Sequence, residues 1–373
     1  MIAITANTSW YIYNFRQNTI KALITAGYDV VAIAPKDDDY SSRLESLGCK
    51  FIHLSIDQGG KNPFNDIKTL FQFYRLFKVN SIKCVLNFTP KNNIYATLAA
   101  SFLKIKTINN IAGLGTLFIE ENLSSKIARI LYKLSQKRAS KIFFQNEEDR
   151  SLFLKGGFAP ENKTERLPGS GVDLTRFNIS PASDDGVVRF LLIARMLYDK
   201  GVGHYVEAAR ELKQKYKQNV EFYLLGFLGV NNPSAITELE MKTWVDEGVV
   251  IYLGTSDSVE KEIAKVDCMV LPSFYREGVP KSLLESGAMG KPIVTTDNVG
   301  CRETVDHGIN GFLCQPRSTE SLVFSLEKII LMTHEQRLKM GLASREKMAC
   351  EFNEQIIIDK YLQTIHSLSP QKK

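Results

Sequence analysis

The sequence has few of the features that mark secreted or membrane-spanning proteins. Its six cysteines are scattered and include no CxxC pair, so we expect free thiols in a reducing compartment rather than a disulfide framework or a zinc site. No window approaches the ~18 consecutive apolar residues of a membrane-spanning helix. The first ten residues, MIAITANTSW, show no basic region before an apolar run. These absences predict a cytoplasmic protein without a transmembrane helix.

Length and charge suggest two parts with different partners. A chain of 373 residues is too long for one ordinary core and suits two domains. Residues 1–165 hold 22 Lys and Arg against 14 Asp and Glu, giving +8, so the remainder carries −2 of the net +6. The basic half is compatible with an anionic membrane surface, nucleic acid or a phosphorylated substrate. Solvated lysines on a soluble domain explain it equally well.

Short β-branched runs alternate with helical periodicity in both halves of the chain. This alternation predicts parallel sheets with helices on both faces, present twice, and hence two doubly wound α/β domains. The predicted strands are 2–5, 30–34, 51–54, 83–87, 106–109 and 141–144, then 188–193, 221–225, 249–253, 268–271 and 292–295. The predicted helices are 14–26, 67–77, 94–103 and 124–137, then 203–216, 234–245, 258–265 and 280–289.

A stretch rich in Pro, Gly, Ser and Asp separates the halves at 166–185, RLPGSGVDLTRFNISPASDD. We therefore expect an N-terminal domain over 1–167, a C-terminal domain over 168–350 and a helical tail over 351–373. Past residue 318 the chain is predicted to be helical, and the tail could pack back across the first domain. Because ligands bind at the carboxyl ends of the strands in such domains, a cleft between the two is the expected ligand site.

The nine residues 277–285, EGVPKSLLE, form a candidate anion site. A helix is predicted to begin at Pro280, because proline suits the first helical position. The N–H groups around Gly278 and Val279 would then lie at the positive end of that helix, which suits a diphosphate. Glu277 on the loop could face a sugar ring, and Glu285 inside the helix could bind a ribose. The alternative is an ordinary amphipathic helix with a capping acid.

Two cations occupy another strand-to-helix loop of the same predicted domain. Arg195 and Lys200 follow strand 188–193 and precede Gly201. The planar fork of arginine and the point charge of lysine suit a diphosphate, although two solvated loop cations would give the same pattern. Both loops should project toward the same edge of one sheet.

These motifs resemble a known family. The stretches LLIARMLYDKG and EGVPKSLLESGAMGKPIVTTDNVGCRETVDHGINGFLC are similar to the donor domain of retaining family 4 glycosyltransferases. That family has the GT-B fold, two Rossmann-like domains facing across a cleft. The stretches NTSWYIYNFRQNTIKALITAGYDVVAIAP, VLNFTPKNNIYATLAA and INNIAGLGTLF resemble the subgroup that extends undecaprenyl-diphosphate-linked sugars in O-antigen, capsule or glycan assembly. The similarity covers nearly the whole chain.

The resemblance implies a role for each motif residue. Arg195 and Lys200 would hold the donor diphosphate and, with Glu277 on the sugar hydroxyls, act in catalysis. Backbone next to the sugar and phosphates would come from Gly278, Val279 and Pro280, and Glu285 would bind the ribose.

The implied reaction transfers a hexose or N-acetylhexosamine, preferably GalNAc from UDP-GalNAc, with retention onto a lipid-diphosphate-linked saccharide. Fixed cations and helix N–H groups would stabilise the leaving diphosphate, so neither a metal nor another cofactor is expected. A phosphate oxygen of the leaving group would take the acceptor's proton.

The acceptor side is less well defined. Many family members carry a histidine in the first domain near the donor sugar, but no histidine occurs between His53 and His204. The comparable loop here is NFTPK, and a second candidate loop is NNIAGLG, although a lone GxG is weak evidence. The acceptor-side candidates are Asn87, Thr89, Lys91, Gly113 and Gly115.

Two helical segments of the basic half combine apolar and cationic residues. Residues 61–80 hold five aromatic residues among cations, and residues 123–137 place Lys126, Arg129, Lys133 and Lys137 at helical spacings. Both suit contact with anionic headgroups, so we expect peripheral association with the inner face of the cell membrane. An apolar helical stripe is more often core, and that alternative stays open.

Four other functions remain possible. A metal-dependent transferase is suggested by Asp37, Asp38 and Asp39, although a solvated turn fits this cluster better. A sugar-nucleotide epimerase can share the two-domain architecture. No helix-turn-helix, RRM or zinc signature supports nucleic-acid binding. A non-catalytic subunit need not keep both carboxylates and both cations.

Overall fold

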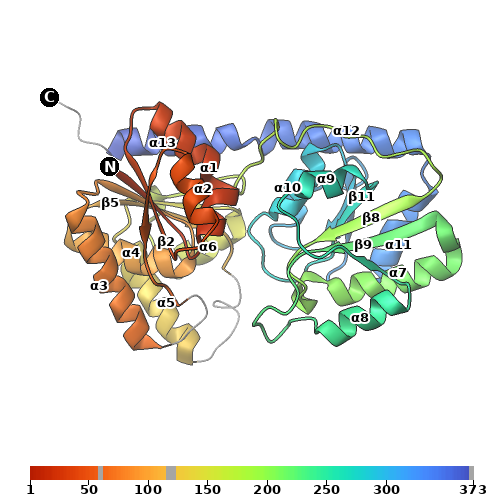
Figure 1. Ribbon diagram of the computed structural model, residues 1–373, viewed down its shortest axis with the longest axis horizontal. Helices are drawn as coiled ribbons and strands as arrows, with labels where there is room; N and C mark the ends of the chain where they lie inside the picture. The colour runs from red at the N-terminus through yellow and green to blue at the C-terminus, as the bar shows by residue number, and fades with distance from the viewer. Residues whose placement is uncertain (58–61, 115–122, 369–373) are drawn as a thin grey trace. The chain divides into compact units, whose positions relative to one another are not determined.

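The computed structural model describes residues 1–57, 62–114 and 123–368. The chain forms two compact units, unit 1 (Met1–Ser170 with Gln355–Lys373) and unit 2 (Gly171–Glu354) (Figure 1). These bounds lie a few residues from the expected domain bounds, and the C-terminal segment belongs to unit 1. Each unit has its own parallel sheet and its own hydrophobic core. The expected cleft between the domains stays a prediction.

Unit 1 is a doubly wound domain around a parallel sheet of order β3-β2-β1-β4-β5-β6-β7. Its strands are β1 Ile2–Thr5, β2 Val30–Ala34, β3 Lys50–His53, β4 Cys84–Asn87, β5 Lys106–Ile111, β6 Lys141–Phe144 and β7 Thr164–Arg166. Its helices are α1 Ser9–Thr25, α2 Tyr40–Ser46, α3 Pro63–Val79, α4 Pro90–Phe102, α5 Leu123–Gln136, α6 Glu147–Lys155 and α13 Glu354–Leu368.

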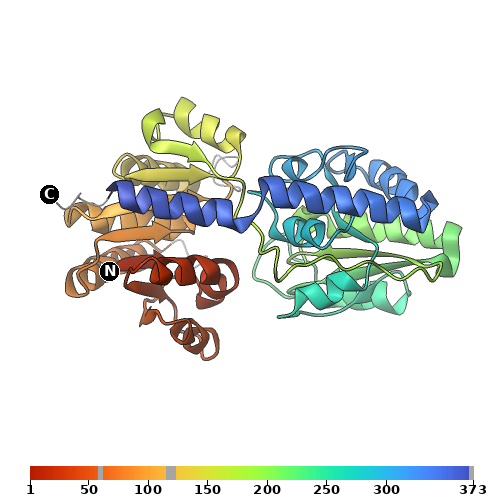
Figure 2. The same ribbon diagram turned by 90° about the horizontal axis from the view of Figure 1, so that it is seen from above.

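Two core clusters cover the two faces of this sheet. On one face, side chains of α1, α2 and α13 pack together, among them Ile12, Leu44 and Tyr361. Figure 2 shows α13 lying along the strands of unit 1. On the other face, α3, α4 and α5 contribute buried aromatic residues such as Phe73 and Tyr132.

Unit 2 repeats the doubly wound arrangement around a parallel sheet of order β10-β9-β8-β11-β12-β13. Its strands are β8 Val188–Ile193, β9 Val220–Leu225, β10 Ile251–Tyr252, β11 Cys268–Leu271, β12 Ile293–Thr296 and β13 Gly311–Cys314. Its helices are α7 Val202–Tyr216, α8 Glu238–Asp246, α9 Val259–Ala264, α10 Lys281–Ala288, α11 Thr319–Leu331 and α12 His334–Glu351.

The predicted alternation of strands and helices is confirmed, with local corrections. Strand β7 begins at Thr164, partly inside the expected linker, and β13 was not predicted. Both are short edge strands, and β7 is built from polar residues without the β-branched run that marks a buried strand. Helix α8 begins at Glu238 instead of 234 because Thr237 and Glu240 form a capping box.

The start of α10 also differs from the prediction. Pro280 is the residue before the helix, with extended backbone (φ −64°, ψ 122°), and the helix begins at Lys281. None of the described helices is both long and apolar enough to cross a bilayer.

Candidate functional site

Three loops that follow strands of unit 2 meet at the carboxyl edge of its sheet. They are 194–201 after β8, 272–280 after β11 and 297–301 after β12. The strands β8, β11 and β12 are consecutive neighbours in the parallel sheet, so their loops emerge side by side. This is the edge at which open α/β sheets bind ligands.

Glycines with left-handed backbone allow these loops to touch. A Cβ on Gly201 (φ +79°) would lie 2.1 Å from the carbonyl oxygen of Pro272, and a Cβ on Gly300 (φ +82°) would lie 1.5 Å from that of Gly278. Only glycine permits both this conformation and this approach. The first and third loops are therefore each packed directly against the second.

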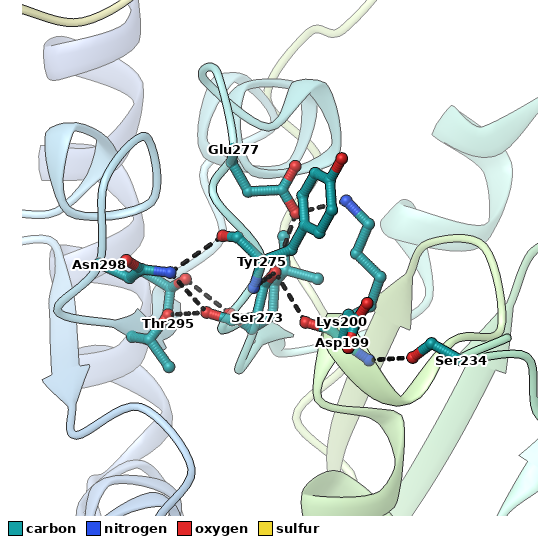
Figure 3. A network of polar contacts seen from close by, with 10 residues as sticks. Asp199, Lys200, Ser234, Ser273, Tyr275, Glu277, Thr295 and Asn298 are labelled. Carbon is teal, nitrogen blue, oxygen red and sulfur yellow. Dashed lines mark hydrogen bonds and ion pairs between the residues drawn. The ribbon is translucent and has the colours of Figure 1, made fainter. Parts of the chain in front are cut away.

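Hydrogen bonds fix the second loop from both sides (Figure 3). The carbonyl of Asp199 accepts the backbone N–H groups of Phe274 and Tyr275, each at 3.1 Å. From the other side, the Asn298 amide donates to the Tyr275 carbonyl at 2.9 Å, and the Thr296 hydroxyl donates to the Ser273 carbonyl. The loop that carries the predicted site is thus held by hydrogen bonds within the protein that a bound ligand need not create.

Lys200 and Glu277 form an ion pair at the centre of this frame. The side chains are only 14% and 11% exposed, and the Ser273 hydroxyl donates to the same carboxylate oxygen at 2.9 Å. The sequence predicted both residues but assigned them to different parts of a donor. The structure brings them together, so a ligand phosphate reaching Lys200 must share it with Glu277.

The start of α10 lies directly after this pair. Pro280 has no side-chain oxygen, and no side chain caps the helix. Gly278 and Val279 are buried beside it. The N-terminal end of the helix carries the partial positive charge expected of an anion site, one residue after the predicted start.

Glu285 lies in the second turn of α10 and is 9% exposed. Its carboxyl group forms no hydrogen bond or ion pair with a residue in the described ranges. Burial raises its pKa to about 7, and the charges of Lys281 and Arg176 oppose this shift only in part. A buried acid without an internal partner is suited to accept hydrogen bonds from a ligand.

Arg195, unlike Glu285, lies at the surface of unit 2. Its side chain is exposed, and among the described residues none forms an ion pair or hydrogen bond with its guanidinium group. The site therefore contains one cation neutralised by a carboxylate, Lys200, and one that is available to an anion, Arg195.

We expect stability to depend on pH through Glu285. Because the folded pKa of about 7 lies above the ordinary glutamate value of 4.5, the folded state binds more protons between these pH values. The free energy of unfolding should therefore fall as pH rises from about 4.5 to about 7, by up to about 3 kcal/mol from this group. Glu285→Gln should be more stable than the wild type at pH 8 and similar to it at pH 4.5, measured by urea unfolding.

The exposed acid Glu247 offers a matched control for this experiment, because Glu247→Gln removes the same charge at the surface. A constant difference between wild type and Glu285→Gln across this pH range would contradict the burial of an ionisable carboxyl.

In unit 1, two of the predicted acceptor-side residues have buried side chains. Asn87 is fully buried, accepting a hydrogen bond from the Thr5 hydroxyl at 2.6 Å and donating to the Asn109 amide oxygen at 2.8 Å. The hydroxyl of Thr89 is also buried and donates to Asn92 at 2.7 Å. These side chains stabilise the carboxyl edge of the sheet, and the structure corrects the expectation that the side chain of Asn87 is available to an acceptor.

The other predicted acceptor-side residues are Lys91 and the glycines of the loop after β5. Lys91 pairs with Asp66 at 2.7 Å, and Asp66 also accepts from the Tyr95 hydroxyl at 2.8 Å. Gly113 has positive φ (+103°) in the loop after β5. Gly115 lies outside the described residues. The acceptor roles of these three residues stay predictions.

The acidic cluster 37–39 forms a turn. Asp37 accepts the backbone N–H groups of Asp39 and Tyr40 at 3.0 and 2.9 Å, and Asp39 pairs with Arg43. Across the described ranges, no group of His, Cys, Asp and Glu side chains has the arrangement of a metal site. The geometry of this cluster is that of a helix-initiating turn.

Comparison with known proteins identifies the family. Residues 188–331 match the family model "Glycosyl transferases group 1", and residues 1–146 match "Glycosyl transferase 4-like". A relative from Campylobacter jejuni, N,N'-diacetylbacillosaminyl-diphospho-undecaprenol alpha-1,3-N-acetylgalactosaminyltransferase, is 31% identical over 94% of both chains. The chain belongs to these group 1 and 4-like glycosyltransferases.

Two further similarities agree with this. An Escherichia coli relative, UDP-Gal:alpha-D-GlcNAc-diphosphoundecaprenol alpha-1,3-galactosyltransferase, is 23% identical over 71% of this chain and 70% of its own length. The crystal structure of a glycosyltransferase from Rickettsia africae superposes with a TM-score of 0.77 at 18% identity, covering 98% of each chain. This glycosyltransferase therefore has the GT-B fold that the resemblance implied.

The sequence did not single out the residues that hold the site together. Asp199 acts through its backbone carbonyl and Ser273 through its hydroxyl. Asn298 acts through its amide, and Gly300 through the absence of a side chain. Asp199, Asn298 and Gly300 lie within the stretches that carried the family resemblance, which was the available signal.

Proposed function

We propose that this glycosyltransferase moves a sugar from a UDP donor onto an undecaprenyl-diphosphate-linked saccharide, with UDP-GalNAc as the preferred donor. The similarity to the Campylobacter jejuni enzyme over 94% of both chains carries the proposal, because that enzyme's name specifies a diphospho-undecaprenol acceptor and an N-acetylgalactosaminyl group. The Escherichia coli relative is also named for a diphosphoundecaprenol acceptor and a UDP-linked donor.

The donor site of unit 2 supports this assignment chemically. Arg195 and the uncapped start of α10 supply positive charge for a diphosphate, and a phosphate that reaches Lys200 would share this lysine with Glu277. Glu277 would accept hydrogen bonds from the sugar hydroxyls, and Glu285 from the ribose. Breaking the anomeric bond transfers negative charge to the leaving diphosphate, and fixed cations that need no rearrangement stabilise that change.

Retention and metal independence are part of the proposal. No carboxylate of this site is assigned as a general base, since Glu277 is paired with Lys200. A leaving phosphate oxygen would remove the proton from the acceptor hydroxyl on the same face, which retains the configuration. The cations of the site would stabilise the diphosphate without a divalent metal.

The test is a transfer assay with UDP-GalNAc, UDP-GlcNAc, UDP-Gal and UDP-Glc and an undecaprenyl-diphosphate-linked sugar, with and without excess EDTA. We expect transfer to be fastest from UDP-GalNAc, to be unchanged by EDTA, and to give an α-linked product by NMR. Release of an epimerised nucleotide sugar without transfer would identify an epimerase instead. A β-linked product would exclude retention, and loss of activity in EDTA would exclude metal independence.

A further inference from the structure

Arg317, in the loop that follows β13, has a strained backbone conformation. Its φ of +61° lies in the left-handed region, which is unfavourable for a residue with a long side chain. The other non-glycine residues with positive φ in the described ranges are Ser81, Lys104 and Lys217. Each of these lies within two residues of a helix end, where left-handed backbone is common. Arg317 instead lies between a strand and the start of α11 at Thr319, so its strain needs another explanation.

The side chain of Arg317 lies over the ring of Phe274. Its guanidinium carbon is 4.8 Å from the ring centroid, which is the geometry of a cation–π contact. Within ranges 1–57, 62–114 and 123–368, no residue forms an ion pair or hydrogen bond with this guanidinium group. A glycine at position 317 would remove the strain but could not make the contact. The contact with Phe274 therefore gives the strained residue a purpose that its backbone alone does not.

Phe274 is also contacted from helix α7. The ring of His204 meets it edge-on, with the centroids 6.0 Å apart and an angle of 78° between the planes. Nδ1 of His204 lies 2.8 Å from the hydroxyl oxygen of Thr319, the first residue of α11. The Phe274 ring is thus contacted by α7 and by the loop before α11, and these two elements are themselves joined by the His204–Thr319 hydrogen bond.

Phe274 belongs to the loop that carries Glu277. The hydroxyl of the preceding residue, Ser273, donates to the Glu277 carboxylate at 2.9 Å (Figure 3). The backbone N–H of Phe274 donates to the Asp199 carbonyl at 3.1 Å. Because Ser273 and Phe274 are adjacent in the chain, a displaced Phe274 would also displace the hydroxyl that holds Glu277. The contacts of the Phe274 ring therefore influence where the carboxylate lies.

We propose that Arg317 is a positioning residue of the donor site, which holds Phe274 and thereby the loop of Ser273 and Glu277. The inference rests on the proposed function, in which Glu277 contacts the donor sugar. A cation–π contact at an exposed position corresponds to a factor of about two to five in an equilibrium constant. Arg317 therefore enriches the loop conformation that fits the sugar by about this factor. The left-handed backbone at residue 317 is the strain that accompanies this placement of the guanidinium group.

Hydrogen exchange of the ligand-free full chain tests the contact independently of the reaction. In Arg317→Met, the amides of Phe274 and Tyr275, which both donate to Asp199, should exchange about two to five times faster than in the wild type. Lys217→Met is the matched control, because it removes an exposed cation that also has positive φ (+53°). Unchanged exchange in Arg317→Met, or equal acceleration in the control, would overturn the proposal.

Steady-state kinetics and UDP calorimetry test whether the contact acts on transfer. Arg317→Met should lower kcat about two- to fivefold and keep UDP affinity within about twofold, because the proposed contact of Glu277 is to the sugar. Arg317→Lys keeps a cation for the ring and should retain most of the wild-type kcat. Weaker UDP binding with unchanged exchange would instead make Arg317 a direct diphosphate ligand. If the wild type transfers from no UDP-sugar, the proposed function fails, whereas the exchange experiment still decides whether Arg317 holds the loop.

Two further variants separate positioning from general stability. Arg317→Gly removes the strain together with the side chain, so Tm should rise or stay within about 2 °C of the wild type, whereas kcat should fall as in Arg317→Met. In a Phe274→Leu background, Arg317→Met should lower kcat no further, because the ring on which Arg317 acts is gone. Wild-type kcat in Arg317→Gly, or an undiminished effect of Arg317→Met in the Phe274→Leu background, would refute the positioning role.

Discussion

Replacing Glu277 by glutamine is expected to lower turnover by a factor of about 100 to 1,000 while changing UDP affinity by less than about threefold. The proposed role of this carboxylate is to contact the donor sugar, and it is held by Ser273 and Lys200. Glutamine preserves the shape but removes the negative charge that would favour an oxocarbenium-like sugar. Steady-state kinetics with UDP-GalNAc, together with UDP titration calorimetry, separate the two effects.

The exposed pair of Glu247 and Arg210 gives the control for this result. Glu247→Gln removes the same charge from a surface ion pair of unit 2 and should keep wild-type kinetics. A Glu277→Gln enzyme with wild-type turnover would place the donor sugar elsewhere. Glu285→Ala should behave in the complementary way, mainly weakening UDP binding, because its proposed contact is to the ribose.

A second prediction concerns the contribution of the Lys200–Glu277 ion pair to stability. Lys200→Met should lower the free energy of unfolding by about 2 to 3 kcal/mol, since it leaves the mostly buried carboxylate of Glu277 without its cationic partner. Lys200→Met/Glu277→Gln should recover much of this loss, because no uncompensated charge remains. Additive losses in the double variant would show that the ion pair itself contributes nothing.

Gly300→Ala is expected to damage both stability and donor binding. The added Cβ would lie 1.5 Å from the Gly278 carbonyl oxygen, and neither backbone can move without displacing the loop that carries Glu277. The free energy of unfolding should fall by more than about 3 kcal/mol. UDP affinity should fall as well, because the start of α10 would shift. Urea unfolding and UDP calorimetry measure the two losses.

Gly308 provides a matched control for this substitution. Its φ of +81° is almost the same as that of Gly300, but a Cβ there would meet nothing within 4 Å. Gly308→Ala should therefore lower the free energy of unfolding by only about 1 to 2 kcal/mol, the strain of left-handed backbone, and leave UDP binding unchanged. Equal effects of the two substitutions would mean that the contact with Gly278 is not important.

The sequence alone determined the two-domain α/β architecture and the positions of the predicted donor-site motifs. Buried strands such as 30–34 and 268–271 are continuous β-branched or apolar runs. Such runs predict parallel strands because helices cover both faces of a parallel sheet. The EGVPKSLLE motif likewise specified a loop acid, a helix start and a second acid, although the helix begins one residue later than predicted.

Only the tertiary structure decided how these residues are used. The pairing of Lys200 with Glu277 joins residues 77 positions apart, and the contact of Gly300 with Gly278 depends on neighbouring strands placing their loops side by side. The burial that raises the pKa of Glu285, the enclosure of Asn87 and the exposure of Phe64 on the same helix as buried Phe73 likewise depend on what packs around each residue. Local periodicity identifies a helix and its chemistry, but the neighbours that bury or expose each side chain come from distant parts of the chain.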